Sequence, residues 1–330
     1  MNGKKVGSNA VTSGRALKIS VVVATFNRRE SLKRLLDSLS RQTLPPADFE
    51  VTVVSDGSTD GTVEMVREMK KRFPNLHVLD MKNRGPGPAR NAGARISRGR
   101  YLAFTDDDCV AAPDWLAQVI RAFENSGAVG VQGRITTDPA TRTPLTHQVE
   151  VHSAWTGIMP ACNAAYLRSA FDAVGGFDET FTFLNEDVDL VWRVEELGKI
   201  IFEPAVHIIH PPRRDPFWKR ACGDWVFEAE FPLYYKNPDK YRKHKSRSPW
   251  RTIYWKVFVI SQYRLAKSCC RYLIRPFKPQ YFLAGLGLVA ARWFNMIRFF
   301  PAYNKARKMC RRQTGQLADK PLTCLPERSA

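Results

Sequence analysis

The first half of the chain alternates nearly continuous apolar runs with stretches in which apolar residues recur every three or four positions. The apolar runs are typical of parallel strands buried on both faces, and they cover residues 19–24, 50–55, 76–80 and 101–105. Between the first two runs, four leucines fall on one helical face: Leu32, Leu35, Leu36 and Leu39. This order predicts an α/β fold, a doubly wound and mostly parallel sheet with right-handed crossovers.

Local signals place the other elements. Asn27 and Glu30 have the spacing of a capping box, which predicts that the first helix begins at Asn27. Further helices are expected at 60–72, at 114–125, at 185–198 and in a stretch that begins near residue 88. Further strands are expected at 128–133, 200–203 and 205–209.

Beyond residue 216 the pattern becomes helical, aromatic and basic. A cationic stripe lies beside an apolar face, and its members are Lys256, Arg264, Lys267 and Arg271. Residues 279–291 are uncharged and mostly apolar, but Arg292 and Arg298 interrupt any longer run. Because about 20 apolar residues are needed to cross a bilayer, the sequence predicts no transmembrane helix.

Charge divides the chain into two parts. The net charge is +19, and residues 213–312 hold 24 bases against five acids, so that region accounts for all of it. We therefore predict a disordered leader (1–17), an α/β catalytic domain (18–212), a basic helical region (213–312) and a flexible tail (313–330). Seven cysteines without CxxC spacing, and no apolar leader, favour a cytoplasmic protein with reduced thiols.

Three adjacent carboxylates, Asp106, Asp107 and Asp108, follow the fourth apolar run. Ligands bind doubly wound sheets at the carboxyl ends of the strands, and three neighbouring anions repel one another unless a cation lies among them. Asp106 and Asp108 would point to the same side of an extended chain. They are the candidate ligands for Mg²⁺ or Mn²⁺. The alternative is a polar turn at a strand end.

Two further loops follow strand ends. SDGSTDGT (55–62) is either a simple Asp–Gly turn or a loop whose Asp56 accepts hydrogen bonds from a ligand. NRGPGPARNAG (83–93) contains glycines but matches neither GxGxxG nor the P-loop pattern, which argues against dinucleotide and P-loop sites.

Six segments between about residues 18 and 212 resemble family-2 glycosyltransferases with the GT-A fold, in their order and spacing. They are ISVVVATFNR, VVSDGSTDGT, NRGPGPARNAG, GRYLAFTDDDCVAAPDWL, CNAAYLRSAFDAVGGFDETF and NEDVDLVWR. The resemblance implies a nucleotide-diphospho-sugar transferase-like domain. A nucleotide-diphosphate sugar, with UDP the expected nucleotide, would bind across the strand ends, and a DxD motif would hold Mn²⁺ or Mg²⁺ on its diphosphate.

The resemblance also implies roles for individual residues. Asp108 would be the direct metal ligand, Asp106 would face the metal-bound water or the ribose, and Asp187 would be the general base with Glu186 beside it. By the same resemblance, the nucleobase pocket would be lined by Ala24, Thr25, Phe26 and Asp56, and either Arg84 or Arg90 would contact the nucleotide. Asn163 would contact the donor sugar and the acceptor. His210 would contact the metal or the diphosphate.

One base and no protein nucleophile imply a single displacement that inverts the anomeric carbon. QxxRW, which processive relatives carry, is absent, so one sugar per encounter is expected. The acceptor would be a hydroxyl of a glycan or of a lipid-linked molecule, as in polysaccharide or glycolipid biosynthesis.

The basic region predicts contact with an anionic membrane surface, which places the protein peripherally on the inner face of the cell membrane. Nucleic acid is disfavoured because no binding module accompanies the charge. A solvated helical bundle without a partner stays open.

Two alternative functions remain. A nucleotidyltransferase would need a glycine-rich loop after the first strand, where the chain reads ATFNRRE. A catalytically inactive membrane- or nucleic-acid-binding scaffold is disfavoured because Asp108 and Asp187 are retained. The donor sugar, the linkage and the oligomeric state do not follow from the sequence.

Overall fold

A computed structural model describes residues 17–137, 143–147, 149–153, 156–181, 184–270 and 278–316. The predicted leader and tail therefore lie almost entirely outside the described residues. In the α/β part the strands are β1 (Ile19–Thr25), β2 (Phe49–Asp56), β3 (Leu76–Met81), β4 (Tyr101–Phe104), β5 (Val110–Ala111), β6 (Gly130–Thr136), β7 (Thr146–His147), β8 (Ala164–Leu167), β9 (Ile200–Ile209) and β10 (Arg213–Arg214).

The helices of this part are α1 (Arg29–Leu39), α2 (Thr62–Met69), α3 (Pro86–Ile96), α4 (Trp115–Ser126), α5 (Arg168–Ala173) and α6 (Glu186–Val194), with short 3₁₀ turns η1 (Pro46–Asp48) and η3 (Ala161–Asn163). The C-terminal part contains α7 (Phe217–Cys222), η4 (Gly223–Ala229), α8 (Glu230–Lys236), α9 (Pro238–His244), the π-helix η5 (Arg251–Ile260), α10 (Ser261–Cys270), α11 (Pro279–Arg298) and α12 (Phe300–Gln316).

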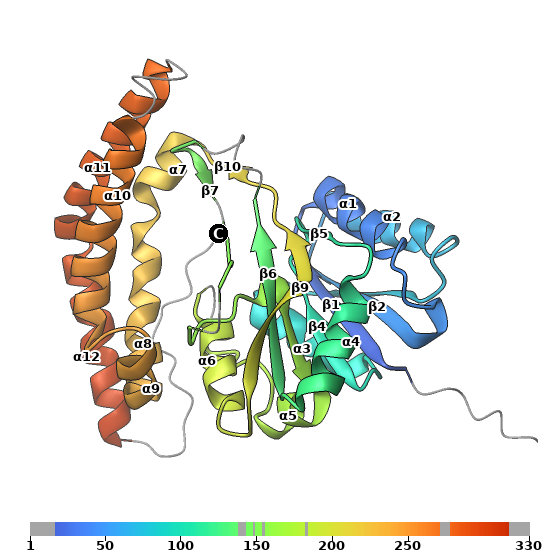
Figure 1. Ribbon diagram of the computed structural model, residues 1–330. Helices are drawn as coiled ribbons and strands as arrows, with labels where there is room; N and C mark the ends of the chain where they lie inside the picture. The colour runs from blue at the N-terminus through green and yellow to red at the C-terminus, as the bar shows by residue number, and fades with distance from the viewer. Residues whose placement is uncertain are drawn as a thin grey trace, which may run out of the picture.

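Eight strands form one sheet in the order β3-β2-β1-β4-β8-β6-β9-β5 (Figure 1). The first four strands are parallel, as the sequence predicts. The second half is mixed, because β8 runs antiparallel to both β4 and β6, β9 is parallel to β6, and β5 is antiparallel to β9. The sheet is therefore a mixed α/β sheet, with four of its seven strand pairings parallel.

Two local predictions need correction. The strands expected at 200–203 and 205–209 are one strand, β9, whose register against β6 shifts between Gly133 and Arg134. Pro204 lies in the shifted stretch, and proline has no N–H to donate to the ladder. The capping box at Asn27 is wrong: Asn27 has a left-handed φ of 51° and its Oδ1 accepts the Thr59 N–H at 2.7 Å, so α1 begins at Arg29.

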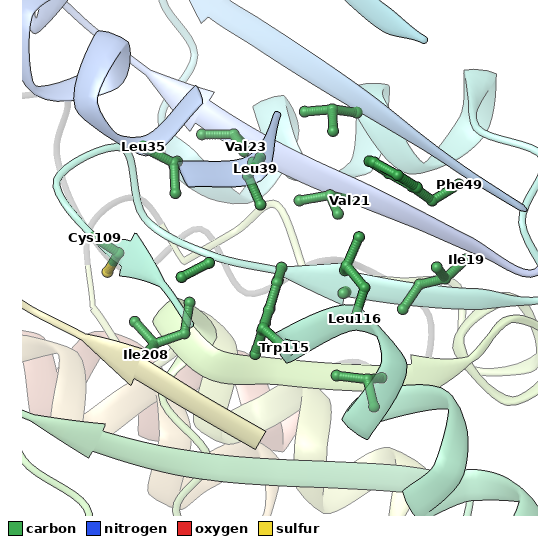
Figure 2. Packing of buried hydrophobic residues seen from close by; sticks show 14 of the residues in the cluster. Ile19, Val21, Val23, Leu35, Leu39, Phe49, Cys109, Trp115, Leu116 and Ile208 are labelled. Carbon is green, nitrogen blue, oxygen red and sulfur yellow. The ribbon is translucent and has the colours of Figure 1, made fainter. Parts of the chain in front are cut away.

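Side-chain alternation along β1 divides the apolar interior into two layers. Ile19, Val21 and Val23 are fully buried on one face of the sheet, where α1 and α4 cover them (Figure 2). Val22 points to the other face and packs in the layer that includes α3, α5 and α6. Successive residues of a strand face opposite sides, so a continuous apolar run serves both layers.

The C-terminal helices contact the α/β part through α6. Trp192 of α6 packs edge to face against Tyr241 of α9, with ring centroids 6.3 Å apart, and stacks on His244 at 5.8 Å. Leu233 and Tyr241 are buried in the same apolar layer as α6. The basic region is thus packed against the helix that carries the predicted general base.

A third apolar cluster holds the C-terminal helices together, with Phe231, Ile253, Phe258 and Tyr303 at its centre. Gly285 lets α11 approach α10 closely, because a Cβ there would overlap the Sγ of Cys269. Within the described residues no one helix has the length and apolarity to span a bilayer, although α11 and α12, bent by 48° at their junction, would do so together by those two measures.

Candidate active site

The three aspartates lie in a turn, which corrects the orientation expected for them. β4 ends at Phe104, and the Cys109 N–H donates to the Asp106 carbonyl at 3.2 Å. Because this segment is not extended, strand alternation does not govern its side chains. Asp106, Asp107 and Asp108 each meet a different set of partners.

Arg28 supplies a cation that the aspartate cluster needs. Its Nη1 lies 2.9 Å from Oδ1 of Asp107 and 2.9 Å from Oδ2 of Asp108. The Thr25 hydroxyl donates to the other oxygen of Asp107 at 2.7 Å. Burial raises the pKa of Asp107 to about 6, although Arg28 and Thr25 oppose the shift. Sequence analysis missed Arg28, whose only signal is its position just after the first strand.

Arg90 links the aspartate turn to the start of α6. Its guanidinium donates to Asp106 Oδ1 at 3.0 Å and to Glu186 Oε1 at 2.9 Å. Burial lowers the pKa of Arg90, but the charges of Asp106 and Glu186 outweigh it and hold the pKa above its ordinary value. The sequence left Arg84 and Arg90 as alternatives for the nucleotide contact, and in the structure these two side chains have different surroundings. Arg90 lies in the site, while the Arg84 side chain pairs with Glu179 at 2.9 Å on the surface.

Asp187 lies beside this pair. One carboxylate oxygen accepts the Ala161 N–H at 3.2 Å and the other accepts the Val188 N–H at 2.8 Å. Burial, followed by the neighbouring Glu186 charge, raises the pKa of Asp187 to about 7 despite the opposing charge of Arg90. A carboxyl group with this pKa exchanges protons near neutral pH, as a general base must.

Backbone strain at Asn185 positions this acidic pair. Asn185 precedes α6 with a left-handed φ of 70°. Its side chain is held from the C-terminal region, since Oδ1 accepts from Lys245 Nζ at 3.2 Å and Nδ2 donates to Glu230 at 3.4 Å. Lys245 and Glu230 form a largely buried ion pair at 2.7 Å. The basic region thus holds the start of α6 in place.

Asp108 and His210 have the arrangement of metal ligands. The His210 Nδ1 lies 3.2 Å from the Pro211 carbonyl, which can only accept, so Nδ1 carries the proton in the neutral ring. Nε2 then presents a lone pair to Asp108 Oδ1 at 3.4 Å, and that buried oxygen has no hydrogen-bond partner among the described residues. A divalent cation bound by both atoms would be a common partner for these two acceptors. Adjacent ligands of an octahedral ion lie about 3 Å apart.

A carboxylate and an imidazole are both ligands that divalent metal ions use in proteins, so the donor set fits a metal without selecting the ion. Cys109 Sγ lies within 4.8 Å of the Asp108 and His210 donor atoms, and sequence analysis did not single it out. Asp106 is predicted as a second ligand, but its Oδ1 is engaged by Arg90 in this structure. Metal binding by Asp106, Asp108 and His210 stays a prediction.

The predicted nucleobase pocket lies at the ends of β1 and β2. Asp56 is buried, and its two oxygens accept the backbone N–H groups of Arg84 and Gly85, both at 2.8 Å. It therefore shapes the loop before α3, with lone pairs left over for a ligand. Phe26 is 43% exposed just beyond β1, whereas Ala24 is partly buried.

The Asn163 side chain is buried and bonded within the core, contrary to the ligand contact expected for it. Its side chain is 1% exposed, and its Oδ1 accepts the Trp115 indole N–H at 2.9 Å. Its Nδ2 donates to the carbonyls of Arg134 and Val206 at 2.9 and 3.0 Å. Both amide protons are used inside the protein, so Asn163 ties β6 and β9 to α4 and has no N–H left for a ligand.

Comparison with known proteins agrees with the fold and the motifs. Residues 20–177 match the model of Glycosyl transferase family 2. The chain is 29% identical over 283 residues to validoxylamine A glucosyltransferase of Streptomyces hygroscopicus subsp. limoneus, an alignment that covers 72% of this chain and 59% of that protein. Residues 20–177 are therefore similar to family-2 glycosyltransferases, and the chain has the GT-A fold of the solved structures described next.

Two solved structures share this fold. Mannosyltransferase PcManGT from Pyrobaculum calidifontis, in complex with GDP-Man and Mn²⁺, has a TM-score of 0.56 at 20% identity and covers 86% of this chain and 88% of its own. S. aureus TarS 1–349 in complex with UDP-GlcNAc has a TM-score of 0.54 at 17% identity, with coverages of 92% and 93%. The chain spans less than two thirds of the length of the curated relatives it matches, so their activities do not transfer directly.

We expect His210→Gln and Asp108→Asn to weaken Mn²⁺ binding at least about tenfold each, since either change removes one ligand. Titration calorimetry with Mn²⁺ in the presence of UDP measures the affinity. His207→Gln is the matched control, because His207 lies on β9 three residues before His210 but bonds to Thr136 Oγ1 at 2.8 Å. Equal affinities in all four proteins would contradict the assignment.

Proposed function

We propose that this protein is an inverting, metal-dependent glycosyltransferase that moves one sugar from a nucleotide-diphosphate sugar to a hydroxyl group of an acceptor. The observation that carries this proposal is the placement of Asp187, whose pKa is raised to about 7, on the same edge of the sheet as the Asp108–His210 pair. The buried Arg90 connects the two through Asp106 and Glu186.

The residues divide the work of a single displacement. Asp187 accepts the proton of the attacking hydroxyl, and the backbone N–H groups of Ala161 and Val188 hold its carboxylate in orientation. A divalent ion held by Asp108 and His210 would supply Lewis-acid stabilisation of the departing diphosphate. Arg28 and Arg90 neutralise the carboxylates around the site, so that a dianionic donor is not repelled.

The donor we propose is a nucleotide-diphosphate sugar, with UDP the first nucleotide to test and Mn²⁺ the first ion. The structural neighbours described above are complexes with GDP-Man and Mn²⁺ and with UDP-GlcNAc, which supports the donor class without deciding the nucleotide. The acceptor we propose is a glycan or a lipid-linked molecule.

We also propose that the protein binds peripherally to the inner face of the cell membrane through α11 and α12. One face of α11 exposes an apolar stripe with helical spacing, made up of Leu283, Leu286, Trp293, Phe294 and Ile297. α12 continues with exposed cations, Lys305, Lys308 and Arg312. These helices lie along the side of the molecule farthest from α1 and α2 (Figure 1). Apolar and cationic side chains on one surface complement an anionic bilayer.

Replacement of Asp187 by Asn tests the catalytic proposal. We expect the transfer rate to fall about 10²- to 10⁴-fold, because the amide cannot accept the proton, while UDP–Mn²⁺ binding persists. Product release from a panel of nucleotide sugars, with and without Mn²⁺, measures the rate. Asp172→Asn, an exposed position on α5, is the control. A rate that Asp187→Asn leaves intact would remove Asp187 from the reaction.

The pH dependence tests the same residue independently. Asp187 acts as the carboxylate, so kcat should fall as pH drops below about 7 and level off above it. Glu186→Gln removes a negative neighbour and should move this acid limb to lower pH. If kcat of Glu186→Gln instead falls at the same pH as in the wild type, or at a higher pH, a group other than Asp187 controls the pH dependence.

Vesicle flotation tests the membrane proposal. The protein should float with vesicles of phosphatidylcholine and about 30 mol % phosphatidylglycerol and bind pure phosphatidylcholine less. Trp293→Ser with Phe294→Ser should reduce binding at least about tenfold, because the double variant has no aromatic side chains at these positions to transfer from water into the bilayer. Ile96→Ser, an exposed apolar position at the end of α3, should bind normally. Equal binding by the α11 variant would refute this surface.

A further inference from the structure

A basic cavity of about 520 Å³ lies in the basic C-terminal region, between β10 and the helices that follow it. β10, α7, η4 and α11 surround it, and Val226 and Phe227 form an apolar part of its wall. Figure 1 shows β10 and α7 between the sheet and α11. None of the residues assigned to the proposed transfer reaction lines this cavity.

Positive charge exceeds negative charge in the cavity. Four cations line it, namely Arg213, Lys219, Arg220 and Arg292, against two carboxylates, Asp215 and Asp224. Asp215 meets three of the cations at 3.3, 3.5 and 3.9 Å, and Asp224 meets Arg292 at 3.5 Å. The arginine pairs of the active site are shorter, at 2.9 to 3.0 Å. The cavity cations are therefore close to carboxylates without forming strong hydrogen bonds to them.

Three arginines of the cavity have an Nε atom that makes no hydrogen bond within the described part of the chain, although the Nε of Arg213 lies 3.3 Å from Asp215 and that of Arg292 lies 3.5 Å from Asp224. The Nε atoms of Arg213, Arg220 and Arg292 are each buried without a hydrogen-bond partner among the described residues. A buried donor left unsatisfied costs free energy, and each such group calls for an explanation. An anion bound in the cavity would add acceptors beside these guanidinium groups.

The arginines also repel one another. Burial and then the charge of Arg292 lower the pKa of Arg220, and the charge of Arg213 adds to this effect. An anion between them would offset the repulsion. Phosphate suits the position because its oxygens match the forked donors of guanidinium groups and its charge balances the excess of two cations.

We infer that this cavity binds a phosphate group of the acceptor or of a membrane lipid, and so anchors that molecule beside the active site. The inference rests on the proposed transfer to a glycan or lipid-linked acceptor. Arg213 follows His210 by three residues, so their Cα atoms are at most about 11 Å apart. Arg292 belongs to α11, the helix whose opposite side exposes the apolar stripe. A phosphate held here lies between the membrane-facing helix and the predicted metal site.

The test is binding of inorganic phosphate without divalent ions, at constant ionic strength, by thermal shift and calorimetry. Wild-type protein should be stabilised relative to chloride. Arg220→Gln with Arg292→Gln should lose phosphate affinity at least about tenfold, because two charged donors are removed. Lys305→Gln with Lys308→Gln removes the same charge from the exposed face of α12 and should keep wild-type affinity.

Arg213→Gln, a partly exposed position on β10, is a second pocket variant in case the double variant fails to fold. UDP–Mn²⁺ binding should be unchanged in every folded pocket variant, so a failure of the phosphate site and a failure of the proposed transfer are separable. Phosphate affinity equal to wild type in the folded pocket variants, or no effect of phosphate on wild-type protein, would overturn the inference.

Vesicles identify the source of the phosphate group once phosphate binding is established. Loss of binding to phosphatidylglycerol-containing vesicles in the pocket variants would assign the cavity to a lipid headgroup. Vesicle binding equal to wild type, combined with lost phosphate binding, would assign it to the phosphate of the acceptor. Both results support a phosphate site.

Discussion

Charge compensation at one edge of the sheet is the constraint on which the site depends. Asp106, Asp107 and Asp108 share a single turn, and Glu186 and Asp187 begin the facing helix. Like charges this close would raise one another's pKa and disfavour the folded state. Arg28 and Arg90 oppose this effect by pairing with four of the five carboxylates at 2.9 to 3.0 Å, although burial still raises the pKa of Asp107 to about 6. Asp187, which neither arginine contacts directly, is the group whose pKa rises to about 7.

The basic C-terminal helices contribute to the site through α6. Lys245 and Glu230 hold Asn185 in its left-handed conformation, and Trp192 packs between Tyr241 and His244. The start of α6 is therefore positioned from two sides, by Arg90 on the sheet side and by the C-terminal helices on the other. This arrangement ties the predicted catalytic base to the region that carries the net charge of the protein.

Prediction of the site from the sequence succeeded unevenly, and the failures have specific causes. Asp108 and His210 are about 100 residues apart in the chain, yet both were assigned to the metal by family resemblance and the fold brings them to 3.4 Å. Asn163 belongs to a motif of the family but bonds within the core. A motif specifies residue types and order, whereas the direction of a buried amide depends on which donors and acceptors surround it.

The order of the elements, the parallel half of the sheet and the two charge regions follow from local patterns, because strand burial and helix amphipathicity repeat along the chain. The mixed half of the sheet, the single bulged strand β9 and the partners of each aspartate do not. They depend on contacts between residues such as Arg28 and Asp107, which lie 79 positions apart. Local periodicity carries no information about such contacts, since they form only when the strands and helices pack together.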